Sequence, residues 1–289
     1  MILIADSGST KTDWRLIDNS GETLLDFSTM GFNPYFHTAD LVEEKMKESL
    51  GAMSINKKVQ HVFFYGAGCS SDSLQAIIRE GLERIFISAS VSVDHDLKAC
   101  AYATYFGEPI ISCILGTGSN SCAFDGETVY EEVPSLAFIL GDEGSGSCFG
   151  KKLIRDYFYK KLPKEISNAF FEEFGLTDKK LVNMVYNEPN ANVYLASFTR
   201  FIGQFRHHPH VKNWLNDGFR EFIDIHVKCF DNWADVKVHF IGSVAFYFLE
   251  DLKQACLDEG VQIGTVIQKP IDNLVRYHIE YLLPELVKV

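Results

Sequence analysis

The chain has 289 residues, of which 46% are hydrophobic, and a formal net charge of −12. This length suffices for one large domain or two of medium size. The acidic balance argues against nonspecific nucleic-acid binding, which depends on neutralising phosphates, but it leaves room for an anionic small ligand held by local backbone N–H groups.

The first third of the chain is predicted to begin as three strands joined by two turns. The strands lie at 2–5, 14–18 and 22–28, and the turn between the last two, Asn19-Ser-Gly21, is a strong hairpin signal. Helices and strands then alternate. We expect helices at 40–52, 73–85 and 97–106, and strands at 59–65 and 90–93.

The opening pattern of strand, Gly/Ser/Thr turn, strand, tight turn and strand occurs a second time at 110–133. The second copy has strands at 110–115, 121–124 and 128–133, with turns at 116–120 and 125–126. Residues from about 150 to 230 are predicted to be mostly helical, with a helix at about 148–161 and breaks at Pro163, Pro189 and Pro209. The chain then ends with strands at 236–241 and 261–266 and helices at 244–259 and 273–282.

The two Gly/Ser/Thr turns are candidates for anion binding. Such a turn points several backbone N–H groups and hydroxyls at one spot, because glycine allows close approach and positive φ while Ser and Thr add donors. One turn of this composition also suits an ordinary hairpin. Two copies at matching places favour a pair of phosphate clamps, although neither has the GxxxxGK[ST] or GxGxxG pattern.

Four segments together carry a resemblance to a known superfamily. LIADSGSTKTDW, VDHDLKACAYAT, ILGTGSNS and HFIGSVA occur in the order of the motifs of the sugar kinase, actin and Hsp70 superfamily. They look most like the N-acetylglucosamine kinase branch, related to the BadF/BadG-type ATPases, over nearly the whole chain. The resemblance implies a two-domain, ribonuclease H-like α/β fold with duplicated five-stranded mixed sheets and an interdomain cleft. The N-terminal domain would comprise residues 1–108 plus 273–289, and the C-terminal domain residues 109–272.

The resemblance implies ATP and Mg²⁺ as cofactors. The first loop would hold the β- and γ-phosphates, with Asp6 facing the metal, and the second loop would lie on the far side of the phosphates. Thr10, rather than Lys11, is the expected donor to a phosphate. The full expected ATP-binding set is Gly8, Ser9, Thr10, Lys11, Thr12, Gly116, Thr117, Gly118, Ser119, Gly242 and Ser243, the last two beside the adenosine.

A pair of carboxylates, Asp94 and Asp96, brackets His95 at the end of a predicted strand, where a period of two puts both on one face. Asp96 also precedes a helix, so a helix cap is the alternative role. The resemblance implies that Asp96 is the catalytic base that accepts the proton of the acceptor hydroxyl. Asp94 stays open as the alternative, or as a structural or metal-side carboxylate, and His95 is expected to be a packed neighbour.

Two further turns are candidates for sugar binding. Gly141-Asp-Glu-Gly144 precedes a predicted helix, where acidic residues also favour the helix dipole. It matches the GDEGS motif of the N-acetylglucosamine kinase branch, which implies that Asp142 contacts the sugar and leaves Glu143 open. Asn33, before Pro34, is either a turn former or, as the resemblance implies, a second sugar contact. The expected sugar-binding set is Asn33, Gly68, Asp96, Asn120 and Asp142.

The segment before this motif departs from the family. N-acetylglucosamine kinases usually carry a Gly-Trp-Gly type segment there, whereas this chain reads PSLAFI at 134–139. The resemblance places the N-acetyl group of the substrate near this segment. The exact sugar is therefore left open.

These observations predict an ATP-dependent kinase of an amino sugar, with N-acetylglucosamine phosphorylated at its 6-hydroxyl. The alternative is a BadF/BadG-type ATPase that drives a conformational change in a partner enzyme. Those activators carry iron–sulfur cysteines, and no cysteine pair here has cluster-like spacing. A regulator of the ROK type would need an N-terminal helix-turn-helix, yet the first phosphate loop starts at residue 6. The expected partner is a small sugar, without nucleic acid or membrane, and a homodimer is an open option.

The cysteines and histidines give no sign of a structural metal site. The seven cysteines are scattered and form no CxxC pair, which indicates free thiols in a reducing compartment. His207-His-Pro-His210 has no Cys or carboxylate at ligand spacing and is expected to be a solvated loop. With no basic leader and no apolar stretch of about 18 residues, the expected location is the cytoplasm.

Overall fold

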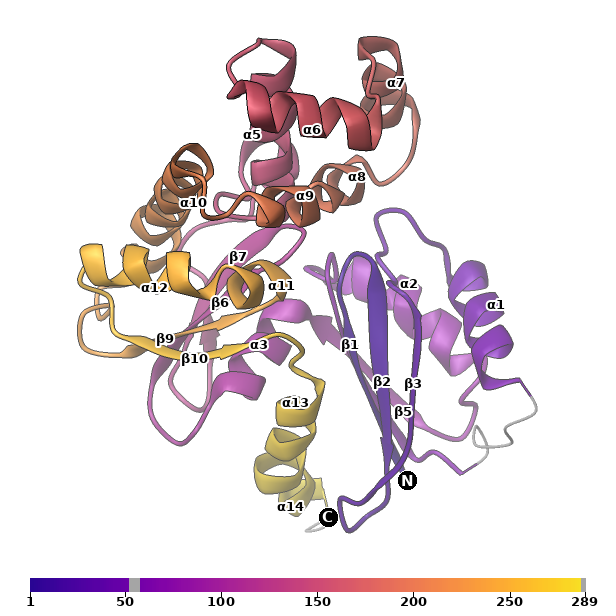
Figure 1. Cartoon of the computed structure of the whole chain (residues 1–289). Coiled ribbons are helices and arrows are strands. Elements are labelled where there is room, and N and C mark those ends of the chain that lie inside the picture. The colour runs from indigo at the N-terminus through magenta and orange to yellow at the C-terminus, as the bar shows by residue number, and fades with distance from the viewer. Residues whose placement is uncertain (52–57, 287–289) are drawn as a thin grey trace. The chain divides into compact units, whose positions relative to one another are not determined.

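The computed structural model describes residues 1–51 and 58–286 (Figure 1). The chain divides into two compact units. The first unit is Met1–Tyr105 with Pro270–Val289, and the second is Phe106–Lys269. Each unit contains one sheet, and the units are described separately below.

The first sheet has β1 at its centre and the strand order β3-β2-β1-β4-β5. On one side of β1, the neighbours β2 and β3 continue it as an antiparallel meander, and on the other side β4 and β5 run parallel to it. The bounds are β1 (Ile2–Ser7), β2 (Lys11–Ile17), β3 (Thr23–Met30), β4 (His61–Gly66) and β5 (Ser90–His95).

Burial explains why β1 is central. Residues 2–5 are all buried, as expected for a strand covered on both faces, whereas β3 shows only exposed and half-buried residues, as an edge strand does. Trp14, Phe32 and Phe64 fill the core on one face, where their rings contact one another.

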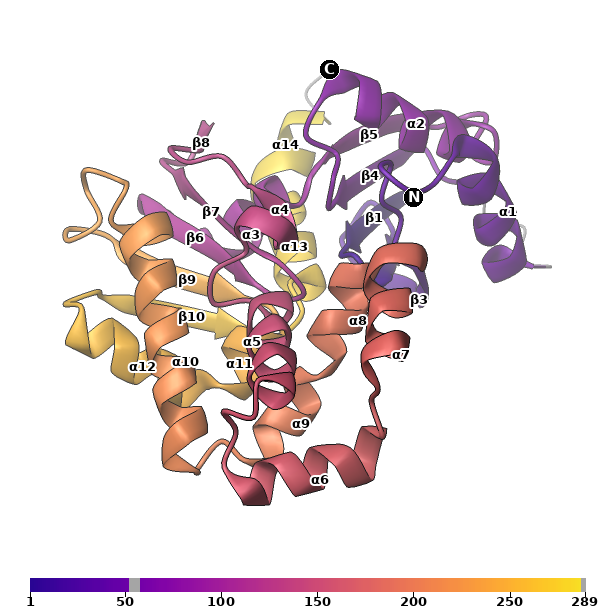
Figure 2. The same cartoon turned by 90° about the horizontal axis from the view of Figure 1, so that it is seen from above.

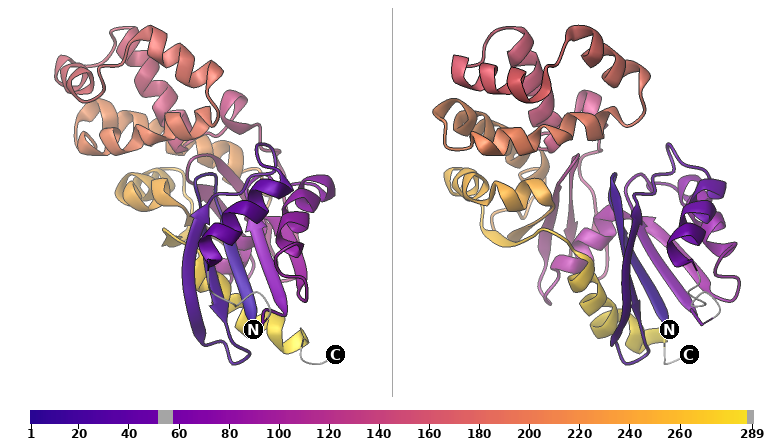
Figure 3. Two further views of the ribbon diagram at one scale, coloured as in Figure 1. Left: turned by 90° about the vertical axis from the view of Figure 1, so that its right-hand side faces the viewer. Right: turned by 45° about the vertical axis from the view of Figure 1, so that its right-hand side comes forward.

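Two pairs of helices cover the two faces of the first sheet, as Figures 1 and 3 show. One pair is α1 (Ala39–Leu50) with α2 (Asp72–Glu83), which begin at the capping hydroxyls of Thr38 and Ser71. The other pair is α3 (Asp96–Thr104) with α13 (Ile271–Tyr277), which pack on each other and on β1. The chain continues from α13 into η3 (His278–Leu282) and α14 (Leu283–Leu286).

The second sheet repeats the arrangement of the first. Its order is β10-β9-β6-β7-β8, with β7 and β8 antiparallel on one side of β6 and β9 and β10 parallel on the other. The bounds are β6 (Ile110–Leu115), β7 (Ser119–Phe124), β8 (Val129–Tyr130), β9 (Lys237–Ile241) and β10 (Ile263–Ile267). The predicted duplication of a five-stranded mixed sheet is confirmed.

Most helices of the second unit lie between β8 and β9, and Figure 2 shows them from above. They bury a core rich in phenylalanine, in which Phe149, Phe219 and Phe222 are almost fully buried. These helices are α4 (Ala137–Leu140), α5 (Gly146–Phe158), α6 (Lys164–Phe174), α7 (Asp178–Val182), η1 (Asn183–Asn187), α8 (Ala191–Ser197), α9 (Thr199–Gln204), α10 (Pro209–Phe222) and η2 (Ile223–Val227). After β9 follow α11 (Ser243–Tyr247) and α12 (Leu249–Asp258), and α12 packs on α10.

Several expected elements differ from those observed. β8 is much shorter than the expected strand at 128–133, and the expected helix at 244–259 is interrupted at Phe248, which follows α11 and precedes α12. The expectation of a solvated loop at 207–210 was wrong, because His208 caps α10 by accepting from the His210 N–H. Ala52, the last residue of one expected helix, lies outside the described residues.

No helix in the described ranges is both long enough and apolar enough to cross a bilayer.

Two helical glycines predict opposite effects of added volume. A Cβ on Gly150 in α5 would lie 1.9 Å from the Leu195 carbonyl oxygen of α8, whereas on Gly203 in α9 it would meet only the Phe248 ring at 3.9 Å. We expect Gly150→Ala to lower the free energy of unfolding by about 1–3 kcal/mol through overpacking. Gly203→Ala should raise it by about 0.5–1 kcal/mol through helix propensity. Urea denaturation of both variants measures this, and a stable Gly150→Ala protein would contradict the close α5–α8 contact.

Candidate functional site

An acidic edge forms in the first unit where β1, β4 and β5 end. The strand register puts Asp6 beside Tyr65, Tyr65 beside Asp94, and Asp6 beside Asp13 of β2. Asp96 follows directly, as the first residue of α3. Parallel strands end at the same edge of a sheet, so the carboxylates that the sequence analysis singled out in this unit are brought together.

Among the carboxylates of this edge, Asp6 has a strongly shifted pKa. Burial, and then the neighbouring carboxylates of Asp96 and Asp13, raise the pKa of Asp6 to about 7. Each cause disfavours the ionised form of Asp6. A divalent cation would relieve this repulsion, and carboxylate oxygens are the ligands that Mg²⁺ prefers.

The carboxylates at this edge also fit the way in which proteins usually bind Mg²⁺. No cluster of three or more His, Cys, Asp or Glu side chains able to hold a metal occurs among the described residues. Mg²⁺ commonly uses one or two carboxylates together with substrate phosphates and water, rather than a cage made by the protein alone. The acidic edge therefore suits a metal that arrives with a nucleotide.

Asp94 and Asp96 have different surroundings. Asp94 accepts a hydrogen bond from the His95 N–H at 3.0 Å and forms an ion pair with Lys98, one turn further along α3. Asp96 stands in the first turn of α3, and the His95 side chain makes no capping hydrogen bond there. The positive end of the helix dipole favours a carboxylate at this position.

The first loop is a tight turn, residues 8–10, between β1 and β2. The Gly8 N–H donates to the Lys11 carbonyl at 3.0 Å, and Gly8 and Thr10 are exposed. Gly31 supports the turn from behind, because a Cβ there would lie 2.2 Å from the Gly8 carbonyl oxygen. The backbone that carries the expected phosphate donors of this loop is thus held by a close contact between Gly31 and Gly8, which only a glycine at position 31 permits.

The side chains of this loop divide into exposed and internal ones. The Thr12 hydroxyl is buried, lies 2.7 Å from the Ser7 hydroxyl and donates to the Met30 carbonyl at 3.0 Å, so it fastens the hairpin. The Lys11 ammonium is paired with Asp13. Among the expected ATP-binding residues of the hairpin, Thr12 therefore faces the interior.

Asn33 and Gly68, both expected at the sugar, lie against each other in the first unit. The Asn33 Oδ1 accepts from the Tyr35 N–H at 3.0 Å, and a Cβ on Gly68 would lie 2.5 Å from that oxygen. Gly68 has φ +83°, so glycine is required here for two reasons. The Ala67 N–H donates to the Ser7 carbonyl, which connects this corner to the end of β1.

The second loop, between β6 and β7, is fastened to the start of α5. The Gly146 N–H donates to the Gly116 carbonyl at 2.9 Å, and the Ser147 N–H donates to the Thr117 carbonyl at 3.0 Å. Within residues 106–269, the amides of Thr117 and Gly118 have no hydrogen-bond partner. The carbonyls of the loop are thus fixed by hydrogen bonds, and two of its amides can bind an anion.

Asp142 lies beneath the second loop and is 8% exposed. Its carboxylate accepts from the Ser119 N–H at 3.2 Å and from the Ser147 hydroxyl at 3.4 Å. Burial raises the pKa of Asp142 despite these donors. The side chain that was expected at the sugar therefore also supports the loop expected at the phosphates.

The turn at Gly242-Ser243 lies directly beside the second loop. Gly242 has φ +121°, and a Cβ there would lie 2.3 Å from the Leu115 carbonyl oxygen. Ser243, the first residue of α11, is exposed. The three segments of the second unit that were expected at the nucleotide or sugar, 116–120, 142 and 242–243, are thus neighbours, and Asn120 follows the loop in β7.

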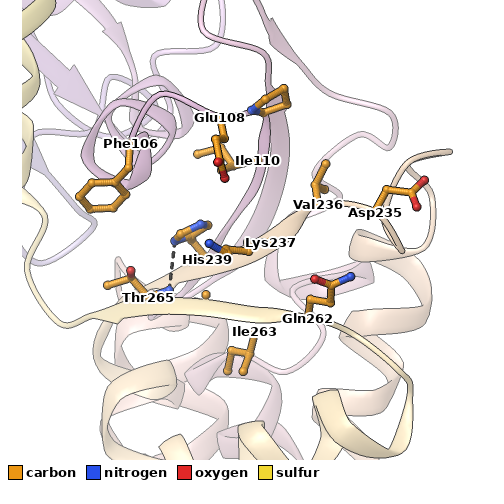
Figure 4. Close-up of a pocket in the computed structure, with 12 residues that line it drawn as sticks. Phe106, Glu108, Ile110, Asp235, Val236, Lys237, His239, Gln262, Ile263 and Thr265 are labelled. Carbon is orange, nitrogen blue, oxygen red and sulfur yellow. Dashed lines mark hydrogen bonds between the residues drawn. The ribbon is translucent and has the colours of Figure 1, made fainter.

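A cavity of about 720 Å³ lies elsewhere in the second unit, at the amino ends of β6, β9 and β10 (Figure 4). His239 lies at its centre and accepts from the Thr265 N–H at 3.1 Å, and burial lowers the pKa of its imidazole to about 4. None of the expected site residues lines this cavity. The glycine loops lie at the opposite, carboxyl ends of β6 and β9.

One pair of residues at the second loop was not found from the sequence. The Glu143 carboxylate lies 3.2 Å from Nε2 of His226, in η2. Glu143 was left open at the sequence level, and His226 was not singled out, because 83 residues separate the two. Only the π-helical turn, which has no sequence signature, puts the imidazole beside the loop.

The comparisons with known proteins agree with the fold described above. A solved structure of a proposed N-acetylglucosamine kinase from Porphyromonas gingivalis is 35% identical with a TM-score of 0.91, over 97% of this chain and 99% of that one. A proposed N-acetylglucosamine kinase from Chromobacterium violaceum is 14% identical with a TM-score of 0.72, over 96% and 98%. No protein-family model and no curated protein sequence matches the chain.

A more distant structure shows the fold alone. It is a ROK family glucokinase from Streptomyces griseus in complex with glucose and AMPPNP, 15% identical with a TM-score of 0.55 over 96% of this chain and 97% of that one. Together with the duplicated sheets, these likenesses define the actin-like ATPase fold of sugar kinases. The chain belongs to the N-acetylglucosamine kinase family of the sugar kinase–actin–Hsp70 superfamily.

The raised pKa of Asp6 predicts a measurable pH dependence. Between about pH 4 and 7 the folded state binds more protons at Asp6 than the unfolded chain does. Its contribution to stability is therefore complete below about pH 4 and is lost as the pH rises through about 7. Asp6→Asn removes this charge, so we expect it to raise the free energy of unfolding at pH 8, without Mg²⁺, by about 1–3 kcal/mol. The full shift corresponds to about 4 kcal/mol, which partial exposure reduces.

Urea denaturation at pH 4 and pH 8 measures this effect. Asp26→Asn is the matched control, because the Asp26 side chain is 75% exposed on β3. That variant should follow the wild-type pH profile. If the stability of Asp6→Asn changed with pH in parallel with that of wild type, the raised pKa of Asp6 would be contradicted.

Proposed function

We propose that this protein is an ATP-dependent kinase that phosphorylates an amino sugar, most simply N-acetylglucosamine at the 6-hydroxyl. The observation that carries the proposal is the duplicated strand–loop–strand unit, in which each sheet ends in a glycine loop held from behind by the backbone. The likeness to the Porphyromonas gingivalis protein, over nearly the full length of both chains, supports the sugar.

The two glycine loops would bind the phosphates of one ATP. The exposed part of the first loop, with Gly8 and Thr10, and the amides of Thr117 and Gly118 in the second are donors suited to anionic oxygens. Gly242 and Ser243 would lie at the adenosine, where the missing Cβ of Gly242 lets this turn pack against the Leu115 carbonyl beside the second loop. Phosphoryl transfer needs such positioning and charge stabilisation more than covalent chemistry.

Mg²⁺ would be held at the acidic edge by Asp6, together with the phosphates of the nucleotide. When bound, it would neutralise charge on the phosphates. In the protein alone, the repulsion among Asp6, Asp13 and Asp96 disfavours full ionisation of the edge.

Asp96 would act as the base toward the sugar hydroxyl. Asp94 is paired with Lys98, whereas Asp96 stands at the start of α3 beside the acidic edge. Asn33 and Gly68, on the same unit, would orient the sugar, and Asp142 and Asn120 would contribute from the second unit. Proton acceptance by Asp96 would leave the sugar oxygen free to attack the terminal phosphorus.

A sugar panel tests the reaction. ADP release, coupled to an optical assay, is measured with N-acetylglucosamine, glucosamine, N-acetylmannosamine and glucose, each with Mg²⁺ and ATP. We expect the highest kcat/KM with N-acetylglucosamine and a 6-phosphate product by ³¹P NMR. ADP release that no sugar accelerates would overturn the kinase and favour the alternative, an ATPase of the BadF/BadG type.

Substitution of the two acidic neighbours tests the base. Asp96→Asn should lower kcat by about 10²–10⁴-fold, the usual contribution of a positioned base, while the affinity for ATP stays within about twofold. Asp94→Asn is the matched control and should retain most of the turnover, because it loses only a partner of Lys98. If Asp94→Asn were inactive and Asp96→Asn active, the role of base would move to Asp94.

A further inference from the structure

A chain of buried polar contacts fastens the second loop to the end of α10. The Ser119 N–H donates to the Asp142 carboxylate at 3.2 Å, and the Ser119 hydroxyl donates to the Glu143 main-chain carbonyl at 2.7 Å. The Glu143 side chain in turn lies 3.2 Å from Nε2 of His226. Both polar hydrogens of Ser119 are thus used inside the protein, and the last link of the chain is an imidazole that is 4% exposed.

The local fold positions His226 for this contact. η2 continues α10 as a π-helical turn, a feature that often marks functional sites, and it packs on β6 and β7. The imidazole stacks on Phe222, with 4.9 Å between ring centroids. A Cβ on Gly144 would lie 3.0 Å from that of Phe222, so the turn at 142–144 presses against the same end of α10.

The hydrogen bonding indicates one tautomer of His226. Its Nδ1 is buried and has no partner among the described residues. A neutral ring with its hydrogen on Nε2 donates to Glu143 and leaves only a lone pair at Nδ1. The other neutral tautomer would bury an unsatisfied N–H, which costs more.

The turn that this contact holds has an unfavourable backbone. Asp142 has φ 62° and Gly144 has φ 66°, and the left-handed region disfavours residues other than glycine. A turn of this kind persists only where its surroundings determine it. Its carboxylates and carbonyls support Ser119, so any movement of the turn would be transmitted to the loop that Ser119 ends.

We propose that Glu143 and His226 are positioning residues for the second phosphate loop. Their contact fixes the turn at 142–144, and the turn sets the backbone of residues 116–119, whose free amides at Thr117 and Gly118 bind the nucleotide phosphates. The role in nucleotide binding rests on the proposed function. The mechanical link from His226 to the loop does not.

Hydrogen exchange of the ligand-free protein tests the mechanical link. His226→Phe keeps the ring stacked on Phe222 and removes the donor, whereas His226→Gln can place an amide N–H near the position of Nε2. We expect amide exchange in a peptide covering residues 115–124 to accelerate about tenfold in His226→Phe, the fold-change for losing one hydrogen bond to a charged group. His226→Gln should stay within about threefold of wild type.

A matched control is His239→Phe, in the middle of β9 among the residues of Figure 4. His239 is also 4% exposed, so its replacement tests the general effect of changing a buried histidine. It should leave exchange at 115–124 unchanged even if the melting temperature falls. In a Glu143→Gln background, His226→Phe should add little, because the contact is already weakened.

Nucleotide affinity, measured by calorimetry with Mg²⁺ and AMPPNP, tests the consequence. His226→Phe should raise the Kd for AMPPNP and the KM for ATP about tenfold each, and it should leave the KM for sugar within twofold of wild type. His226→Gln should restore the Kd and the KM for ATP. Equal damage by Phe and Gln, unchanged exchange at 115–124 in His226→Phe, or faster exchange with unchanged Kd would each overturn the proposal. If the wild-type protein bound no nucleotide, the proposed function would fail, and the exchange result alone would decide the link from His226 to the loop.

Discussion

The contact between a glycine loop and the backbone segment behind it is the constraint on which the rest of this structure depends. A loop whose backbone amides stay free for a ligand cannot use those amides for hydrogen bonds of its own, so other segments must hold its conformation. In the first unit Gly31 approaches the turn after β1 to within a distance that no Cβ permits, and in the second unit the start of α5 donates to the carbonyls of Gly116 and Thr117. Both solutions place small residues where the chain must come close.

The two units meet this constraint in different ways. The first uses side-chain hydroxyls, Ser7 and Thr12, inside a short hairpin. The second inserts a large helical region between β8 and β9 and uses it to hold the loop through Asp142, Glu143 and His226. The same sheet topology thus supports one glycine turn held within a short hairpin and one glycine turn held by a distant helical segment.

The two units also differ in the charged groups near their glycine loops. The first unit gathers Asp6, Asp13 and Asp96 at one edge, where burial, and then repulsion from Asp96 and Asp13, raise the pKa of Asp6. The second unit presents backbone amides at Thr117 and Gly118, and the carboxylates of Asp142 and Glu143 beside the loop are engaged by Ser119, Ser147 and His226. The two units thus differ in the groups that they place at the ends of their sheets, carboxylates in the first and backbone amides in the second.

The sequence by itself determined the repeated strand–turn–strand unit, because apolar runs and Gly-rich turns are local signals that recur at 2–28 and 110–133, and the resemblance then implied the duplicated five-stranded sheets. It also placed Asp94 and Asp96 on one face at the end of a strand, because side chains alternate with a period of two, whereas the role of Asp6 came from the resemblance. It did not indicate that Thr12 faces inward, that Asp142 lies beneath a loop more than twenty residues away, or that His208 caps a helix. The tertiary structure alone decided the partner of Glu143, because an interaction across 83 residues, made by a π-helical turn, depends on how helices pack and not on any local pattern.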